Sequence, residues 1–353
     1  MILEDKINAF SQVGAFLKQF AQVPFQKNEA LTINEGFYNS FEELIHRLDQ
    51  NNGWFTIEQV LHANENWANA LTKDNLTTWL SDYTIEGEPL KTVALILAGN
   101  IPYVGFHDVL SVLLTGNKAL IKLSSNDEHL IPFVLKVLQA IEPRFEDRIT
   151  ITKERFETFD AVIATGSDNT ARYFDYYFGK YPNIIRKNRN SVAVLTGEET
   201  KEQLVALGED IFRYYGLGCR NVSKLFVPKG YDFTAFFEAM YEQKEVIYYE
   251  KYANNYDYNK AVFLMSNFSI LDNEFLTIKE DTSYASPISS VFYEYYDSLE
   301  QVKEKITKDR EKLQCVVSSQ LFDDEVAFGQ TQKPALNDYA DGVDTIKFLV
   351  SLK

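Results

Sequence analysis

Residues 91–127 read KTVALILAGNIPYVGFHDVLSVLLTGNKALIKLSSND, and this stretch decides the fold class. It opens with an apolar run at residues 93–98, which has the length and composition of a buried parallel strand. Gly99 and Asn100 end the run. The Ile101-Pro102 pair then favours an extended turn, because a residue before proline disfavours helical dihedral angles.

A helix and a second strand follow this turn. Residues 108–114 form the predicted helix, Gly116 and Asn117 end it, and residues 119–123 form the predicted strand. Strand, turn, helix and strand make the βαβ unit of an open α/β sheet, in which ligands bind beyond the carboxyl ends of the strands. The unit lacks the GxGxxG dinucleotide fingerprint, so by itself it indicates only an α/β domain with a polar loop above its sheet.

Length and composition favour two globular domains. A chain of 353 residues stretches a single core, and 45% hydrophobic with 24% charged residues is ordinary for a soluble protein. The net charge of −16 argues against affinity for nucleic acid or an anionic membrane, because phosphate binding needs clustered cations. An anionic cofactor is still compatible, since local amides and one lysine can hold it.

Several features predict a cytoplasmic protein without metal. Cys219 and Cys315 are too few for a disulfide framework, which indicates a reducing compartment. The first residues lack the cationic start and apolar run of a signal peptide, and no apolar run approaches the ~20 residues that span a membrane. The four histidines lack metal-ligand spacing, so we predict no metal site.

Alternating helix and strand patterns predict an α/β architecture along the whole chain. A strand is expected at residues 161–165, followed by a helix that Ser167 caps, and another strand is expected at residues 260–266. The predicted organisation has four parts: a helical N-terminal layer (1–85), a nucleotide-binding α/β domain (86–215), a catalytic α/β domain (216–330) and a C-terminal extension (331–353) with a final strand at 345–352.

Four short motifs occur in a fixed order: GNIP at residues 99–102, TGNKALIKLSS at 115–125, ATGS at 164–167 and GLGC at 216–219. As an ordered set they resemble the aldehyde dehydrogenase superfamily, and within it the LuxC-like fatty acyl-CoA reductases. The resemblance covers roughly residues 92–319. It implies two open α/β domains, a Rossmann-like cofactor domain and a catalytic domain.

Cys219 is the candidate nucleophile. Glycines before it open the backbone to a reactant, and Arg220 places a cation near a potential thiolate. Most lone cysteines are small buried hydrophobes, and Cys315 in the apolar run LQCVVSS is interpreted that way. By resemblance, Cys219 stands where the superfamily keeps its nucleophile.

The resemblance also assigns an oxyanion donor and a cofactor site. Asparagine at a sharp turn usually serves the turn itself, but Asn100 matches the superfamily's amide that stabilises the thioester oxyanion together with the Cys219 N–H. Such a donor typically contributes ~3 kcal/mol. The residues that the resemblance places beside the cofactor are Gly99, Lys122, Ser124, Ser125, Gly166 and Ser167.

The strand end at Ser124 and Ser125 predicts the cofactor. Many NAD-using relatives carry a proline and an acidic residue at these positions, and that acid would bind a ribose 2′-OH and repel a 2′-phosphate. Neutral serines remove the repulsion, so we predict NADPH in preference to NADH.

Two glutamates of the superfamily are missing. The segment that carries the water-activating glutamate reads RKNRN here, at residues 186–190, which suits an acyl-enzyme that exchanges with coenzyme A instead of being hydrolysed. The ribose-holding glutamate is replaced by Ser283 in SYASP, although Glu280 and Asp281 are close in sequence. The ribose contacts therefore stay open.

The resemblance implies NADPH-dependent reduction of a fatty acyl-CoA to the aldehyde through a cysteine acyl-enzyme. One alternative is a reductase of an acyl phosphate, as in the glutamyl-phosphate reductases, which would want a basic phosphate pocket that the sequence neither shows nor excludes. Another is a degenerate binding protein on the same fold. The missing glutamates favour it, whereas Cys219, Asn100 and Lys122 argue against it. Chain length of the acyl group and formation of a homo-oligomer stay open.

Overall fold

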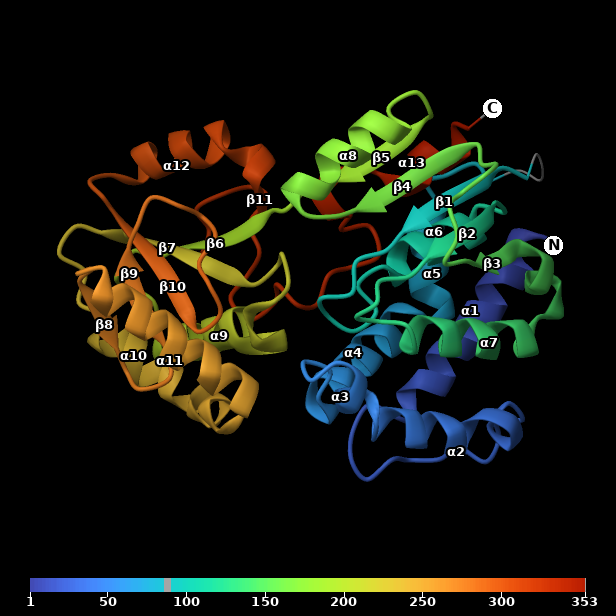
Figure 1. Cartoon of the computed structure of the whole chain (residues 1–353), viewed down its shortest axis with the longest axis horizontal. Coiled ribbons are helices and arrows are strands. Elements are labelled where there is room, and N and C mark those ends of the chain that lie inside the picture. Colours follow the sequence, from blue (N-terminus) through green and yellow to red (C-terminus); the bar gives the residue numbers. More distant parts are fainter. Residues whose placement is uncertain (86–89, 353) are drawn as a thin grey trace. The chain divides into compact units, whose positions relative to one another are not determined.

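The structure is a computed structural model that describes residues 1–85 and 90–352. It divides into two compact units, the first made of Met1–Lys187 with Ala335–Lys353 and the second of Asn188–Pro334 (Figure 1). Residues 86–89, where the predicted nucleotide-binding domain begins, lie outside the described part. Each unit is built on its own sheet, so each is described by itself.

The first unit is centred on a parallel sheet. Within the described residues this sheet has five strands in the order β3-β2-β1-β4-β5. The chain passes from β1 outward to β2 and β3, then crosses back to β4 on the other side of β1, which is the strand order of dinucleotide-binding domains. The strands are β1 (Thr92–Ile96), β2 (Lys118–Lys122), β3 (Ile149–Ile151), β4 (Ala161–Thr165) and β5 (Asn183–Arg186).

Helices cover both faces of this sheet (Figure 1). Helix α6 (Phe106–Leu114) packs on β1 and β2, whereas α8 (Asp168–Phe178) packs on β4 and β5. Phe174 and Phe178 of α8 pack against a cluster that includes Ala94 and Val162 on one face of the sheet. The central strands β1 and β4 are therefore buried along most of their length, as the continuous apolar run at the start of the quoted stretch predicts.

The N-terminal segment forms the predicted helical layer. Helix α1 contacts α4, α5, α6 and α7, and its side chains Phe10, Val13 and Leu17 follow helical spacing with 0% exposure. The helices of this layer and its neighbour are α1 (Leu3–Lys18), α2 (Asn34–Ile45), α3 (Leu48–Asn51), α4 (Ile57–Ala70), α5 (Lys73–Leu80) and α7 (Leu130–Ile141).

The C-terminal segment is helix α13 (Thr345–Val350), where the sequence analysis predicted a final strand, so that prediction is wrong. Asp344 caps the helix by accepting a 2.8 Å hydrogen bond from the Lys347 N–H. Ile346 and Leu349 lie on one helical face and are buried, and α13 packs on α6. A short apolar run does not distinguish strand from helix, and the cap decided it here.

A buried ion pair joins this helix to the sheet. Arg186 at the end of β5 pairs with Asp108 of α6, and both side chains are buried. The same guanidinium donates a 3.1 Å hydrogen bond to the hydroxyl of Thr345. Arg186, the first residue of RKNRN, therefore holds the sheet, α6 and α13 together inside the first unit.

The second unit is built on a mixed sheet. Within the described residues its strand order is β11-β6-β7-β10-β9-β8, parallel except for β8. The elements are β6 (Asn190–Val194), β7 (Val222–Pro228), β8 (Ile270–Asp272), β9 (Thr277–Glu280), β10 (Ser290–Tyr296), β11 (Leu313–Val317), α9 (Lys201–Phe212), α10 (Thr234–Met240), α11 (Glu250–Met265) and α12 (Leu299–Lys308). Because β6 pairs with β7 and β11, it belongs to this sheet, whereas the predicted division at residue 215 placed it with the nucleotide-binding domain.

Helix α11 replaces the strand predicted at residues 260–266, which is a second wrong assignment. Tyr252, Tyr256 and Phe263 are buried at helical spacing, so the helix continues through the apolar run that suggested a strand. The helical spacing of buried residues can be recognised only over the whole of α11, because two of the three buried side chains are tyrosines in its first half and lie outside residues 260–266.

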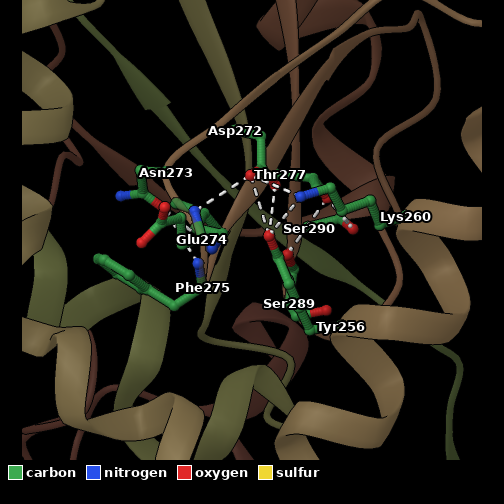
Figure 2. A network of polar contacts seen from close by, with 10 residues as sticks. Tyr256, Lys260, Asp272, Asn273, Glu274, Phe275, Thr277, Ser289 and Ser290 are labelled. Carbon is green, nitrogen blue, oxygen red and sulfur yellow. Dashed lines mark hydrogen bonds and ion pairs between the residues drawn. The ribbon is translucent and has the colours of Figure 1, made fainter.

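A polar network fixes α11 to the edge strand β8 (Figure 2). The Asp272 carboxylate accepts hydrogen bonds from the Tyr256 hydroxyl at 2.8 Å and from the Lys260 ammonium at 2.9 Å. It also accepts the N–H of Glu274 at 3.1 Å, at the turn after the strand. Figure 2 shows the side chains of Tyr256 and Lys260 directed at this one carboxylate. Burial raises the pKa of the Tyr256 hydroxyl to about 12, so it stays a donor at neutral pH.

Replacing Asp272 by Asn is expected to destabilise the protein by about 1–3 kcal/mol, because an amide offers one acceptor oxygen where the carboxylate offers two. Chemical denaturation followed by circular dichroism measures the effect. Asp257→Asn, at an exposed position of the same helix, is the matched control and should change little. Equal stability of the two variants would show that the network does not hold α11.

Candidate functional site

The carboxyl edge of the first sheet is the candidate cofactor site. Ile96 at the end of β1 lies opposite Lys122 in β2 on one side and Ala164 in β4 on the other. The loops after these three strands therefore open at the same edge. Strand order reverses there, and open α/β sheets bind ligands at such a switch point.

Gly99 and Ser124 are packed against each other at this edge. A Cβ added to Gly99 would lie 2.7 Å from both the Cβ and the Oγ of Ser124, so only glycine fits. The Ser124 hydroxyl accepts the N–H of Asn126 at 3.2 Å and thereby shapes its own turn. Ser125 is exposed beside it. The structure thus brings these sequence-predicted residues together, with different surroundings for the two serines.

Asn100 and Lys122 follow the same strand ends. Asn100 comes directly after Gly99 in the loop that leaves β1, and its side chain is half-buried. Lys122 is the last residue of β2, is also half-buried, and its carbonyl accepts the N–H of Leu97 at 3.0 Å. Both residues therefore lie on the edge where the sequence analysis expected them.

Gly166 and Ser167 form the turn between β4 and α8. The Ser167 hydroxyl accepts the Thr170 N–H at 3.3 Å, which confirms the predicted N-terminal cap. A Cβ at Gly166 would lie 2.9 Å from the Phe174 ring, so a larger residue would push against the helix. The N-terminus of α8 therefore lies at the carboxyl end of β4, and a helix N-terminus favours anionic groups.

Asp127 joins two loops of this edge, and sequence reasoning missed it. Its carboxylate accepts the N–H of Tyr103, from the loop after β1, at 3.3 Å and the N–H of Leu130, at the start of α7, at 3.2 Å. Burial raises the pKa of the Asp127 carboxyl to about 6. Tyr103 has a φ of 59° and donates its hydroxyl to Asn64 at 2.8 Å. An aspartate three residues before a helical run was the available signal for this contact.

Cys219 lies in the second unit, on the loop between α9 and β7, and is exposed. The Ser191 hydroxyl donates to the Cys219 carbonyl at 2.9 Å, and the Arg220 guanidinium donates to the Thr331 carbonyl at 2.6 Å. The Cys219 carbonyl and the side chain of the next residue, Arg220, are therefore held by hydrogen bonds. Cys315 is buried in β11, in agreement with its interpretation as a small core residue.

The turn before Cys219 has an unusual backbone. Tyr214, Tyr215 and Gly216 are consecutive residues in the left-handed region, with φ values of 53°, 57° and 76°. For residues with a Cβ this costs roughly 1–2 kcal/mol each. The Tyr215 ring compensates in part by stacking on Tyr249 with centroids 4.7 Å apart. Only Gly216 signalled this turn in the sequence, because two tyrosines give no hint of positive φ.

The acids near Ser283 have different surroundings. Asp281 accepts the Ser283 N–H at 2.8 Å and pairs with Lys279, so its carboxylate is used inside the unit. Glu280 at the end of β9 is exposed. Of the two acids close to the missing family glutamate, Glu280 is thus the one at the surface.

The described part of the chain, residues 1–85 and 90–352, has neither a candidate membrane span nor a candidate metal-ligand cluster. No helix in that part of the chain combines the length and apolar character needed to cross a bilayer. No three side chains of His, Cys, Asp or Glu gather there in an arrangement suited to a metal ion.

Residues 72–245 match a family model described as acyl-CoA reductase (LuxC), and this range includes Asn100, Lys122, Gly166 and Cys219. Among curated proteins none matches the chain.

Three solved structures illustrate the shared fold. Aldehyde dehydrogenase 21 from Physcomitrella patens has a TM-score of 0.68 at 13% identity, covering 99% of this chain and 84% of that one. An acetylating aldehyde dehydrogenase from Geobacillus thermoglucosidasius has a TM-score of 0.65 at 13% identity, with coverage of 99% and 90%. Betaine aldehyde dehydrogenase from Staphylococcus aureus, solved with NAD+, has a TM-score of 0.62 at 12% identity, with coverage of 86% and 68%. The predicted aldehyde-dehydrogenase-like α/β fold is therefore confirmed.

The raised pKa of Asp127 makes a testable pH dependence. The folded carboxyl keeps its proton up to about pH 6, whereas the unfolded one releases it near 3.8, so the contribution of Asp127 to stability should fall as pH rises from 4 to 6. The loss amounts to at most about 3 kcal/mol. Asp127→Asn should remove the Asp127 contribution, so its unfolding free energy should fall less steeply than that of wild type between pH 4 and pH 7. The buried Asp210 carboxyl, whose pKa is also raised to about 6, keeps its own contribution in both proteins. Asp49→Asn, at an exposed site, controls for net charge, and an identical slope in wild type and Asp127→Asn would contradict the assignment.

Proposed function

We propose that the protein reduces a fatty acyl-CoA thioester to the aldehyde with NADPH, because residues 72–245 match the family model of acyl-CoA reductase (LuxC). The observation that carries the proposal is the loop with Cys219. It lies inside the family match, leaves Cys219 exposed, and is held by hydrogen bonds at the Cys219 carbonyl and at the Arg220 side chain. A fixed, accessible cysteine is what nucleophilic catalysis requires.

In the proposed reaction the Cys219 thiolate attacks the thioester carbonyl carbon. The C–S bond to coenzyme A breaks, coenzyme A leaves as the thiolate, and the acyl group remains on Cys219 as a new thioester. When bound, NADPH supplies the hydride that reduces this acyl carbon. The C–S bond to Cys219 then breaks, the aldehyde forms, and the thiolate is regenerated. Covalent capture divides one difficult step into two easier ones.

Asn100 is the proposed oxyanion donor for this chemistry. Negative charge develops on the carbonyl oxygen as the thiolate adds, and a preorganised amide N–H stabilises that charge more than it stabilises the substrate. Asn100 is half-buried and follows Gly99 in the loop that leaves β1. The missing water-activating acid in RKNRN is consistent with transfer to coenzyme A instead of hydrolysis.

The edge of the first sheet has the features of a nucleotide site. The strand order reverses at β1, Gly99 brings two loops into contact, and α8 begins at the end of β4. We propose that the pyrophosphate binds near Gly166 and Ser167, where the helix N-terminus favours anions. Lys122 and Ser125 would then read the adenosine ribose and its 2′-phosphate.

Of the two serines, Ser125 is the better candidate for contact with the 2′-phosphate of NADPH. The Ser124 hydroxyl is already used by the Asn126 N–H, whereas Ser125 is exposed. The overall charge of −16 opposes an extra phosphate, but exposed charges beyond ~8 Å are largely screened at physiological salt. A charge-assisted contact to phosphate commonly contributes ~1.5–3 kcal/mol, so the local contact with Lys122 should dominate.

Replacing Cys219 by Ser is expected to abolish turnover while NADPH binding changes little, because the residue acts on the acyl group alone. Mass spectrometry after incubation with palmitoyl-CoA, without NADPH, should show an acyl adduct on the peptide with Cys219. Cys315→Ser, at the buried cysteine, is the matched control and should keep the adduct. An adduct on Cys315, or wild-type turnover without Cys219, would reject the proposed nucleophile.

A second experiment defines the length of the acyl chain. The rate of NADPH oxidation is measured with a series of acyl-CoAs from acetyl to palmitoyl.

Ser125→Glu is expected to reverse the cofactor preference, because the new carboxylate repels a 2′-phosphate and accepts a ribose 2′-OH. Wild type should bind NADPH more tightly than NADH, and the variant should weaken NADPH by at least ~10-fold relative to NADH. Dissociation constants from nucleotide fluorescence measure both. Ser125→Gln has the same size without the charge and should keep the wild-type preference. Equal affinities in wild type, or the same shift in both variants, would show that Ser125 does not read the phosphate.

A further inference from the structure

We propose that Asn221 is the positioning residue that sets the reactivity of Cys219, through the backbone of the turn before it. The inference rests on the proposed role of Cys219 as nucleophile. Asn221 lies two residues after the cysteine and is 3% exposed. Its side chain forms hydrogen bonds with main-chain groups of this turn and of α9.

The Asn221 carboxamide bridges both ends of the turn. Its oxygen accepts the Gly218 N–H at 2.8 Å. Its nitrogen lies within hydrogen-bonding distance of the carbonyl oxygens of Asp210 (3.1 Å), Ile211 (3.3 Å) and Arg213 (2.8 Å). One side chain therefore ties the end of α9 to the residue directly before Cys219.

These partners explain why the residue is an amide. The last carbonyls of a helix have no intrahelical donor, and α9 ends at Phe212. The chain then enters the left-handed region at Tyr214 and does not continue as a helix that could satisfy them. A side chain that donates to these carbonyls and accepts from Gly218 must carry both an N–H and an oxygen. Aspartate lacks the donor, and a hydrophobic residue lacks both.

The same contacts keep the strained turn in place. The two left-handed tyrosines are strained, and the Leu217 N–H bonds to the Tyr214 carbonyl at 3.1 Å across the turn. The hydrogen bonds of the buried Asn221 amide offset this strain. Without Asn221, relaxation of Tyr214 and Tyr215 toward right-handed dihedral angles would lower the free energy of the turn. The position and surroundings of the Cys219 sulfur would then change.

Two further contacts hold the C-terminal side of the cysteine. The Ser191 hydroxyl donates to the Cys219 carbonyl, and the Arg220 side chain donates to the Thr331 carbonyl. Asn221 acts on the N-terminal side, where its oxygen accepts the Gly218 N–H. Its role is exerted through the backbone, and it need not touch the substrate.

The test uses the full-length protein and iodoacetamide, a thiol reagent that needs neither acyl-CoA nor NADPH. In Asn221→Ala and Asn221→Asp, the rate of alkylation at Cys219, read by peptide mass spectrometry, should change by at least ~10-fold. The pH midpoint of that rate should also shift. Asn64→Ala is the matched control, since Asn64 is a fully buried asparagine of the first unit with hydrogen bonds to Phe20 and Tyr103. It should lower the melting temperature without changing the alkylation profile of Cys219.

Hydrogen exchange of the wild-type protein gives a second measurement that needs no variant. The Gly218 amide, bonded to the buried Asn221 oxygen, should exchange about as slowly as the amides of α9. Fast exchange of the Gly218 amide, or a folded Asn221→Ala with an unchanged alkylation profile, overturns the proposal. A third outcome separates the two proposals. If the Asn221 variants change the alkylation rate of Cys219 but wild type forms no acyl adduct with palmitoyl-CoA, the positioning role of Asn221 stands and the proposed substrate is rejected.

Discussion

Burial of β1 on both faces is the constraint on which the first unit depends. Residues Val93, Ala94 and Leu95 are 0% exposed between two helical layers, and β2 and β4 take up the ladder hydrogen bonds on either side. No polar side chain can be accommodated within such a strand without a partner. The polar residues of this region are therefore displaced to the carboxyl edge, where Gly99 allows two loops to approach each other. Fold stability and a place for a ligand follow from the same arrangement.

In the second unit, buried polar contacts hold the loop between α9 and β7 that carries Cys219. Asp210, buried in α9, accepts the N–H groups of Gly329 at 2.7 Å and Thr331 at 3.0 Å, and burial raises the pKa of its carboxyl to about 6. Thr331 in turn accepts a hydrogen bond from Arg220. The segment that leads out of this unit is thereby bonded to the loop that carries Cys219. Buried polar groups of this kind stabilise only when they are fully paired, so they fix one geometry of the loop.

The wrong predictions share one cause. Residues 260–266 and 345–352 are short apolar runs, and both were assigned as strands although they are helical in α11 and α13. Such runs do not reveal their period, and the outcome depends on caps such as Asp344 and on which face is buried. The predicted domain boundary at residue 215 differs from the observed boundary after Lys187 for a related reason. The strand β6 pairs with β7 and β11, far away in sequence, and no local pattern reports such a pairing.

The sequence by itself determined the α/β class, the βαβ unit at residues 91–127, the helical N-terminal layer and the set of candidate residues from Gly99 to Cys219. These follow from apolar periodicity, glycine turns and motif order, which are local properties of the chain. The tertiary structure alone decided how those residues are held: the Asp127 bridge between two loops, the left-handed turn at Tyr214, and the Asn221 carboxamide that bonds to Gly218 and Arg213 before Cys219. Each of these depends on a buried polar group that meets main-chain atoms brought to it by the fold. Residue type indicates that such a group must be paired, but only the packed chain determines which partner it finds.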